Sequence, residues 1–305
     1  MNTASTFRRS LCRISRRQLE RSTVIGSHAE NSVPLIYHDF SPHRHFSSVS
    51  EAEVAKFAKF SKTWWDPKIN PLVGMNPIRV EYMMQQLPSA STNKAKNLPP
   101  LSGFKALDVG CGGGLLSESL ARLGATVTAV DPSTELVEQA QHHAQLDRRT
   151  QSIDYRGGWT VEQLAAEQQT IAQESSNDQQ LFDVVCLLEV IEHVTDVDSM
   201  LTAVSSLLKP DGTLFVSTLN RTLKSKAVAI VGAEYVMRYL PPGTHDWNQF
   251  RSPDEVQTLV KKVGLEQVDA SGMILASPPF FGQWNWKIDP KDTDINWIGA
   301  YRRTE

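Results

Sequence analysis

The chain has 305 residues, of which 40% are apolar, enough for one large α/β domain or two smaller ones. Its formal net charge of −3 argues against a protein that binds nucleic acid over a large surface. The sequence contains no apolar run of about 18 residues, so it predicts no membrane-spanning helix. The three cysteines, Cys12, Cys111 and Cys186, lack the spacing of a metal or disulfide site and fit a reducing compartment.

The N-terminal region differs in composition from the rest of the chain. Residues 1–19 are rich in arginine, contain no acidic residue and place apolar side chains on one helical face. This composition is typical of a mitochondrial transit peptide, although a disordered basic tail would share it. We therefore predict a targeting or disordered segment over residues 1–50 and a folded domain over residues 51–305.

From residue 105 onward, short apolar runs alternate with helical patterns. The pattern predicts strands at Lys105–Val109, Thr126–Asp131, Ile153–Arg156, Phe182–Leu188, Thr213–Thr218, Leu265–Ala270 and Ile295–Tyr301. It predicts helices at Leu115–Leu123, Thr134–Leu146, 161–173, Ser199–Leu208 and from Ser252 to Lys262, with a turn at Lys209–Gly212. Two further helices are expected upstream, one over Val54–Ser61 and one beginning after Asn76-Pro77. The predicted fold class is α/β, a doubly wound, Rossmann-like, mostly parallel seven-stranded sheet with N-terminal helices.

A glycine-rich turn, Asp108-Val109-Gly110-Cys111-Gly112-Gly113-Gly114, joins the first predicted strand to the helix that follows. Glycines let the chain turn sharply and let a ligand lie against bare backbone. Asp131 ends the next strand, where its carboxylate can accept hydrogen bonds from both hydroxyls of a ribose. This layout predicts a nucleoside-containing ligand; the alternative is a tight structural turn that binds nothing.

The spacing within the turn separates two kinds of ligand. A dinucleotide fingerprint reads G-x-G-x-x-G, whereas the glycines here are Gly110, Gly112, Gly113 and Gly114. Asp108 precedes them, and its carboxylate would repel a pyrophosphate but suit a cationic ligand. S-adenosylmethionine carries an ammonium and a sulfonium group. The residues therefore favour an S-adenosylmethionine-dependent methyltransferase over a dehydrogenase.

The turn and Val130-Asp131 resemble the class I methyltransferases, and further segments resemble the ubiquinone biosynthesis O-methyltransferase family. These segments are Thr63-Trp64-Trp65-Asp66, Asn76-Pro77-Ile78-Arg79, Glu189-Val190-Ile191-Glu192-His193-Val194, Ser217-Thr218-Leu219-Asn220-Arg221, Val231-Gly232-Ala233-Glu234-Tyr235 and Gly243-Thr244-His245-Asp246-Trp247. The resemblance extends from about Lys56 to Tyr301, with an enlarged region at 157–180.

The resemblance implies S-adenosylmethionine-dependent O-methylation of ring hydroxyls on polyprenylated catechol (dihydroxybenzoate) and demethylubiquinol intermediates of ubiquinone, or coenzyme Q, biosynthesis. It also implies a peripheral position at the matrix side of the mitochondrial inner membrane, in a complex with other coenzyme Q biosynthesis proteins. Two alternatives are an O-methyltransferase for another small phenolic metabolite and a cofactor-binding assembly subunit. Together, the turn and the resemblance assign cofactor binding to Arg79, Asp108, Gly110, Gly112, Asp131 and Leu188. The resemblance further implies Glu189, Glu192 and His193 as ligands of a divalent metal, Mg²⁺.

The same three residues are the candidates for catalysis. A phenol has a pKa of about 10, so its oxygen needs a base or a metal ion to become nucleophilic at neutral pH. Glu189, Glu192 and His193 are spaced i, i+3, i+4, directly after the strand Phe182–Leu188, and would share one face if the chain turns helical there. They could bind a metal, or His193 could act as a general base oriented by a glutamate. Magnesium prefers oxygen ligands, and the glutamates could instead cap a helix start.

Several other residues have two possible roles. Arg79 could bind the carboxylate of S-adenosylmethionine with its guanidinium, or it could be a surface charge. Trp64 and Trp65 could cover the cofactor or pack against the N-terminal helix. His245 and Asp246 could line the acceptor pocket or form a structural turn.

One segment could bring the enzyme to a lipid-soluble acceptor. Lys224–Tyr239 is apolar with cationic ends and too short to span a bilayer. It could be an interfacial helix that contacts anionic lipid, within a membrane-proximal insertion near 222–250, or an ordinary amphipathic helix packed on the sheet.

Overall fold

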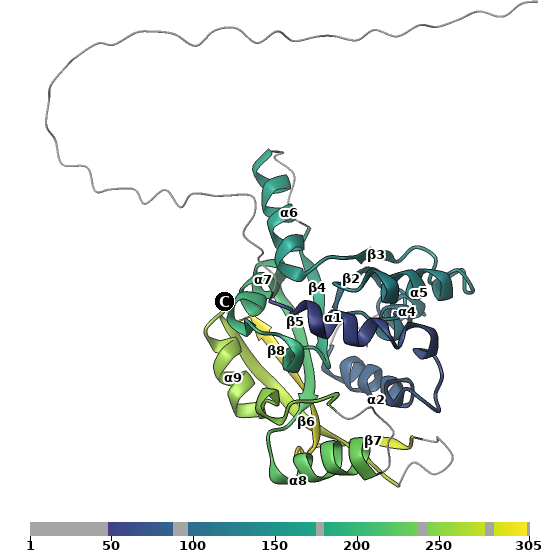
Figure 1. The fold of residues 1–305 in the computed structure, drawn as a ribbon. Helices are drawn as coiled ribbons and strands as arrows, with labels where there is room; N and C mark the ends of the chain where they lie inside the picture. The colour runs from purple at the N-terminus through teal and green to yellow at the C-terminus, as the bar shows by residue number, and fades with distance from the viewer. Residues whose placement is uncertain (1–47, 88–96, 175–179, 237–242, 278–283, 304–305) are drawn as a thin grey trace, which may run out of the picture. The chain divides into compact units, whose positions relative to one another are not determined.

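The computed structural model describes residues 48–87, 97–174, 180–236, 243–277 and 284–303 (Figure 1). The chain divides into two units, Met1–Arg44 and His45–Glu305, and every described residue belongs to the second. Nearly all of the predicted targeting segment, 1–50, therefore lies outside the described residues. Within those residues, none of the helices has the length and apolar character needed to cross a bilayer.

In the described part of the chain, eight strands form one sheet in the order β3-β2-β1-β4-β5-β8-β6-β7. The strands are β1 (Lys105–Val109), β2 (Thr126–Asp131), β3 (Asp154–Gly157), β4 (Phe182–Leu188), β5 (Leu208–Leu219), β6 (Leu265–Leu275), β7 (Trp286–Asp289) and β8 (Asn296–Arg303). Strands β1 to β5 pair in parallel, whereas β8 is antiparallel to β5 and β6, and β7 is antiparallel to β6. The predicted doubly wound, mostly parallel sheet is confirmed, with β7 as an additional edge strand.

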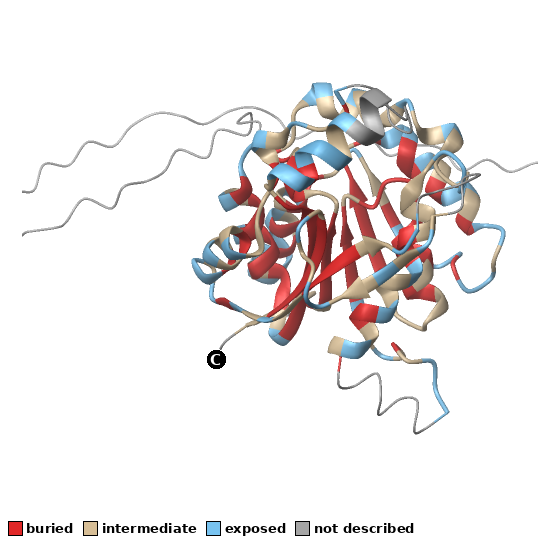
Figure 2. Ribbon diagram, turned by 90° about the horizontal axis from the view of Figure 1, so that it is seen from below, coloured by how far each residue is buried: buried red, intermediate tan, exposed pale blue. Residues whose placement is uncertain are grey.

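Helices cover both faces of this sheet (Figures 1 and 2). They are α1 (Glu51–Ala58), α2 (Pro71–Gln86), α4 (Leu115–Arg122), α5 (Thr134–Ala144), α6 (Val161–Glu174), α7 (Val197–Leu207), α8 (Leu223–Ser225) and α9 (Pro253–Lys261), with 3₁₀ turns η1 (Ser61–Thr63), η2 (Ile191–His193) and η4 (Trp247–Gln249) and a π-helix η3 (Lys226–Val236). One apolar cluster joins the sheet to α2, α4 and α5, and a second joins it to α6, α7 and α9. Successive strand residues alternate between the two clusters, as Ala106 and Leu107 do, because a strand directs neighbouring side chains to opposite faces.

The helix α2 begins earlier than the sequence predicted. The side chain of Asn70 caps it by accepting a backbone N–H, and Pro71 occupies the first turn, where a missing N–H costs little. Pro77 therefore lies inside the helix, so the prediction of a start after Asn76-Pro77 was wrong. The Asn76 amide donates to the Leu115 carbonyl over 3.1 Å, which ties α2 to α4 behind the glycine turn.

The predicted turn at Lys209–Gly212 is also wrong, because these residues belong to β5. The pairing of β4 with β5 shifts register between Phe182 and Val184, as at a β-bulge. Asp211 has a φ of 62°, in the left-handed region. A bulge accommodates proline and glycine inside a strand, which explains why this segment has the composition of a turn.

Candidate active site

The glycine turn lies at the carboxyl end of β1, where open α/β sheets place their ligands. Gly112 has a φ of 52°, which suits glycine, and its N–H donates to Asp131 Oδ2 over 2.8 Å. The Ser133 N–H donates to Asp131 Oδ1, also over 2.8 Å. Burial raises the pKa of Asp131 to about 6, while these two N–H groups act in the opposite direction. The structure thus brings Asp131 beside the turn, and each carboxylate oxygen retains a lone pair for a ribose hydroxyl.

Asp108 is buried behind the turn, with 3% of its surface exposed. The Ser117 hydroxyl donates to Asp108 Oδ2 over 2.5 Å. Burial raises the pKa of Asp108 to about 6, opposed by the Ser117 hydrogen bond and then by the charge of Arg79. Asp108 therefore places a carboxylate behind the glycine turn, and one of its two oxygens already accepts the Ser117 hydroxyl.

Arg79 extends from α2 toward the same edge of the sheet and is 3% exposed. Its Nη2 donates to Asn76 Oδ1 over a long 3.4 Å, and among the described residues its Nε has no hydrogen-bond partner. Burial lowers the pKa of the guanidinium, whereas the carboxylates of Glu189 and Asp108 raise it. A buried cation with an unpartnered donor is costly, so this site favours an anion such as the carboxylate of S-adenosylmethionine. The sequence also allowed Arg79 to be a surface charge, and its burial excludes that alternative.

Val190 brings the next loop against the glycine turn. A Cβ placed on Gly110 would lie 2.6 Å from Val190 Cγ2, and Gly110 has a φ of 70°. The loop follows Leu188, the predicted cofactor residue at the end of β4, which is 8% exposed. The loop that carries the predicted catalytic residues therefore packs, through Val190, against the predicted cofactor turn.

Replacing Gly110 with Ala is expected to weaken S-adenosylmethionine binding by about ten-fold or more, because the new methyl group forces either the turn or Val190 to move. Isothermal titration calorimetry would measure the change. Gly103→Ala is the matched control, since Gly103 has a φ of 86° but nothing within 4 Å of a Cβ. Equal affinities of the two variants would contradict a ligand role for the turn.

The structure does not bring Glu189, Glu192 and His193 together as one ligand set. Glu189 has a φ of 59°, and its Oε1 accepts the Ser217 hydroxyl over 2.7 Å. Glu192 is 4% exposed, and its Oε2 has no hydrogen-bond partner among the described residues. Burial and the Glu189 carboxylate raise the pKa of Glu192 well above its usual range. Within the described ranges, no three His, Cys, Asp or Glu side chains are placed to hold a metal ion.

His193 instead turns toward α1. Its Nδ1 lies 2.9 Å from Glu53 Oε2, and its ring packs edge-on against Phe57 at 4.7 Å. Burial lowers the pKa of His193, and Glu53 partly opposes this. The hydrogen bond from His193, followed by that from Lys56, lowers the pKa of Glu53 to about 2. Glu53 was not predicted as a site residue, because 140 residues of sequence separate it from His193.

A second contact joins α1 to the segment that contains His245 and Asp246. The sequence allowed two roles for these residues, lining the acceptor pocket or forming a structural turn. Lys56 Nζ donates to both Glu53 Oε1 and the Thr244 carbonyl, each over 2.8 Å. The ring of His245 lies 6.3 Å from that of His193. Asp246 caps η4 by accepting the N–H of a residue two positions on, which is the structural alternative. His245 is therefore the member of this pair that lies near the candidate base.

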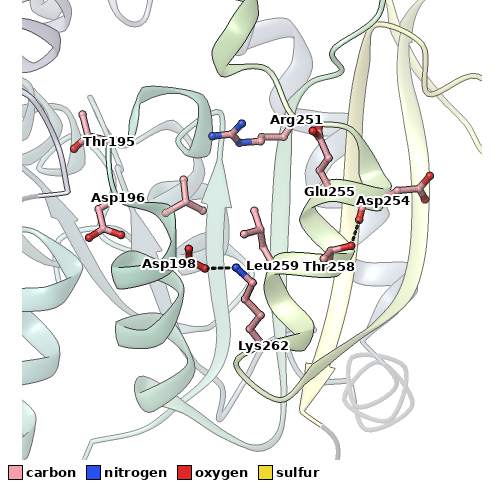
Figure 3. Close-up of a pocket in the computed structure, with 10 residues that line it drawn as sticks. Thr195, Asp196, Asp198, Arg251, Asp254, Glu255, Thr258, Leu259 and Lys262 are labelled. Atoms are coloured by element: carbon pink, nitrogen blue, oxygen red, sulfur yellow. Dashed lines mark hydrogen bonds and ion pairs between the residues drawn. The ribbon is translucent and has the colours of Figure 1, made fainter.

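A groove of about 580 Å³ lies elsewhere, between α7 and α9 (Figure 3). Its walls carry Asp198 and Lys262, which pair over 3.0 Å, together with Asp196 and Arg251. None of the predicted cofactor or catalytic residues lines it. The groove begins near Thr195, just after the His193 loop, and is separate from the glycine turn.

Comparison with known proteins decides the family. Residues 79–270 match the family described as a methyltransferase domain. The ubiquinone biosynthesis O-methyltransferase of Cereibacter sphaeroides (strain ATCC 17029 / ATH 2.4.9) is 45% identical over 262 residues, which cover 85% of this chain and 98% of that protein. The protein of the same name from Bradyrhizobium sp. (strain ORS 278) is 42% identical, covering 83% and 92%. The chain belongs to the ubiquinone biosynthesis O-methyltransferase family. It is an S-adenosylmethionine-dependent O-methyltransferase, as the sequence predicted.

A solved structure supports the fold of this family member. Magnesium protoporphyrin IX methyltransferase from Synechocystis PCC 6803, with bound SAH, is 18% identical. It aligns with a TM-score of 0.50 over 83% of this chain and 100% of that one. At this identity the likeness concerns the fold alone, and it agrees with the class I methyltransferase architecture expected from the sequence.

Proposed function

We propose that this O-methyltransferase methylates ring hydroxyls of polyprenylated catechol and demethylubiquinol intermediates of ubiquinone biosynthesis. The observation that carries the proposal is the packing of Val190 against Gly110, three residues before His193, whose ring nitrogen pairs with Glu53. In this proposal the acceptor hydroxyl binds between His193 and the methyl group of the cofactor. The names of the relatives supply the pathway, and the lipid tail follows from the resemblance of this chain to the family.

In the proposed reaction, Arg79 binds the cofactor carboxylate and Asp131 binds the ribose hydroxyls. S-adenosylmethionine, when bound, supplies a methyl carbon activated by a sulfonium. His193 donates its Nδ1–H to Glu53, so its Nε2 carries the lone pair and takes the proton from the acceptor hydroxyl. The oxygen–methyl bond forms as the sulfur–methyl bond breaks, and the proton remains on His193. Glu53, ionised at neutral pH, stabilises the imidazolium.

The direct test is transfer of a labelled methyl group from S-adenosylmethionine to a short-prenyl catechol. We expect methylated product, with lower turnover on the same catechol lacking the prenyl chain. Transfer only to unprenylated phenols would favour the alternative enzyme for another phenolic metabolite. Tight cofactor binding without transfer to any phenol would favour an assembly subunit.

Magnesium assistance by Glu189, Glu192 and His193 is a second proposal for the same loop. The unpartnered Oε2 of Glu192 and its proximity to Glu189 support a cation there, whereas the bond from His193 to Glu53 opposes a three-residue site. Full turnover of the chelator-treated enzyme would show that His193 acts as base without a metal. Loss of turnover that only added Mg²⁺ restores would instead support the metal proposal.

We also propose that the segment beginning at α8 contacts anionic lipid. Leu223 is 81% exposed and Val231 is 51% exposed, so apolar side chains face outward at this end of the sheet. Lys224 pairs with Asp292 and Asp294, which limits its own attraction to lipid. Residues 237–239 of the predicted interfacial segment, Lys224–Tyr239, lie outside the described residues.

Leu223→Asp is expected to reduce flotation with vesicles that contain anionic lipid, because the charged side chain opposes insertion into the interface. Leu146→Asp is the matched control, since Leu146 follows α5, outside the proposed lipid-contacting segment, and is 80% exposed. Equal flotation of both variants and the unmodified enzyme would argue against this contact.

We further propose that residues 1–50 direct the enzyme to the mitochondrial matrix, where it works with other coenzyme Q biosynthesis proteins at the inner membrane. The arginine-rich, acid-free start of the chain supports targeting, and the resemblance supports the complex. Fusion of residues 1–50 to a fluorescent protein tests the first part. Co-purification of the tagged full chain from mitochondria tests the second.

A further inference from the structure

The indole of Trp64 lies directly on the glycine turn. A Cβ placed on Gly112 would lie 2.7 Å from Trp64 Cη2, and one placed on Gly113 would lie 2.6 Å from Trp64 Cγ. The ring therefore contacts the bare backbone of both glycines. Its Nε1 is buried and has no hydrogen-bond partner among the described residues.

This position differs from that of a core tryptophan. In the described chain, neither Trp64 nor Trp65 is a member of the two apolar clusters that hold the helices to the sheet. Trp64 is only partly buried, and its indole meets glycine backbone. A ring that contributed only packing would be expected among apolar side chains, with its N–H satisfied.

The residues around Trp64 are anchored on both sides. Trp65 Nε1 donates to the Gly113 carbonyl over 2.9 Å, and its ring stacks on His143 at 3.5 Å with an interplanar angle of 8°. Asn70, the cap of α2, donates from Nδ2 to the Trp64 carbonyl over 2.8 Å. The Trp65 side chain and the backbone carbonyl of Trp64 thus hold Trp64 against the turn, and the Trp64 indole makes none of these contacts itself.

The same stretch of chain reaches the candidate base. Val49 forms an isolated antiparallel bridge with Val194, and Glu53 binds His193. Residues 48–70, which we call the strap, therefore run from the loop Glu189–Val194, which we call the catalytic loop, at one end to the glycine turn at the other.

We propose that Trp64 is a cofactor-contacting residue and that the strap is a cover for the S-adenosylmethionine site. The glycine backbone under Trp64 is the surface against which the ligand would lie, so the indole must move outward when the ligand enters. It then closes on the ligand from the side opposite Gly112, where its unpartnered N–H can donate to a cofactor oxygen. This inference rests on the proposed cofactor site at Arg79 and Asp131.

The test compares the dissociation constants of S-adenosylmethionine and S-adenosylhomocysteine for the full chain and its variants by calorimetry. Trp64→Ala is expected to weaken both by about ten-fold or more, and Trp64→Phe by clearly less, because the contact is largely apolar. Trp247→Phe is the control, since Trp247 donates to the Thr222 carbonyl, away from the turn. Unchanged affinity in a folded Trp64→Ala enzyme would overturn the proposal.

Hydrogen exchange provides a second readout that requires no substitution. Addition of S-adenosylhomocysteine to the unmodified enzyme is expected to slow exchange in the strap, and unaltered exchange there would count against a cover. Asp131→Ala distinguishes a failure of the proposed cover from a failure of the proposed cofactor site. If it abolishes cofactor binding while Trp64→Ala has no effect, the cover is rejected and the site stands. If it leaves affinity unchanged, the site itself is misplaced.

Discussion

Replacing His193 with Gln is expected to lower kcat by about a hundred-fold or more, with little change in affinity for S-adenosylmethionine. Glutamine has a similar reach and can still donate to Glu53, but it cannot accept and hold the proton of the acceptor hydroxyl. Single-turnover methyl transfer would measure the chemical step. His142→Gln is the matched control, because His142 is an exposed histidine on α5. A kcat within about two-fold of the control would remove His193 from the mechanism.

The pH dependence of the same reaction tests whether His193 is the group that accepts the proton. Burial lowers the pKa of His193 from 6.5, so the side chain is neutral at pH 7. We therefore expect kcat/KM to fall only when the pH drops toward the lowered pKa of His193. Glu53→Gln removes the charge that raises the pKa of His193, so the acid limb should move to lower pH while kcat decreases. Glu51→Gln, an exposed position on the same helix, should leave the limb in place. An unmoved limb in Glu53→Gln would show that another group titrates.

Strand positions at the centre of the sheet could be predicted from the sequence because they depend on local composition. β1, β2 and β4 occupy the predicted residues, since each is an apolar run bounded by polar or turn residues. β7 was missed because it has only four residues and pairs only with β6 in the described sheet. An edge strand of this kind depends on pairing between distant segments, which leaves no periodic pattern in the chain.

Some features of the candidate site could likewise be predicted from the sequence, and others could not. Asp131 lies beside the glycine turn as predicted, because strand, turn, helix and strand are consecutive and their geometry is nearly fixed. The common face expected for Glu189, Glu192 and His193 is not formed, since only a single 3₁₀ turn follows Glu189, itself left-handed. No local pattern indicates that the catalytic loop would bind α1. That pairing follows from the path of the strap across the carboxyl end of the sheet.

A left-handed backbone at Glu189 costs roughly 1 kcal/mol or more, which other contacts must offset. The Glu189 N–H and side chain both bond Ser217 on the adjacent strand, the former over 2.9 Å to its carbonyl. This conformation directs the chain from β4 into the short turn that presents His193. Strain at the end of a central strand, beside a ligand site, agrees with a functional role for the loop.

Arg79→Ala is expected to reduce S-adenosylmethionine affinity by about a hundred-fold, because the guanidinium is buried and its Nε has no hydrogen-bond partner among the described residues. Ligand-induced stabilisation provides the measurement. At a free concentration 100 times the original Kd, the ligand adds about 2.7 kcal/mol to the unmodified enzyme but only about 0.4 kcal/mol to a variant that binds a hundred-fold more weakly.

Two comparisons make this result specific to the carboxylate of the ligand. Arg79→Lys retains the charge but not the planar pair of donors, so its affinity should lie between those of the unmodified enzyme and Arg79→Ala. Asp108 and Glu189 lose a compensating cation in Arg79→Ala, so the unliganded protein should also be less stable, which thermal unfolding without ligand records separately. If the ligand stabilised Arg79→Ala as much as the unmodified enzyme, the buried guanidinium would serve only those two carboxylates.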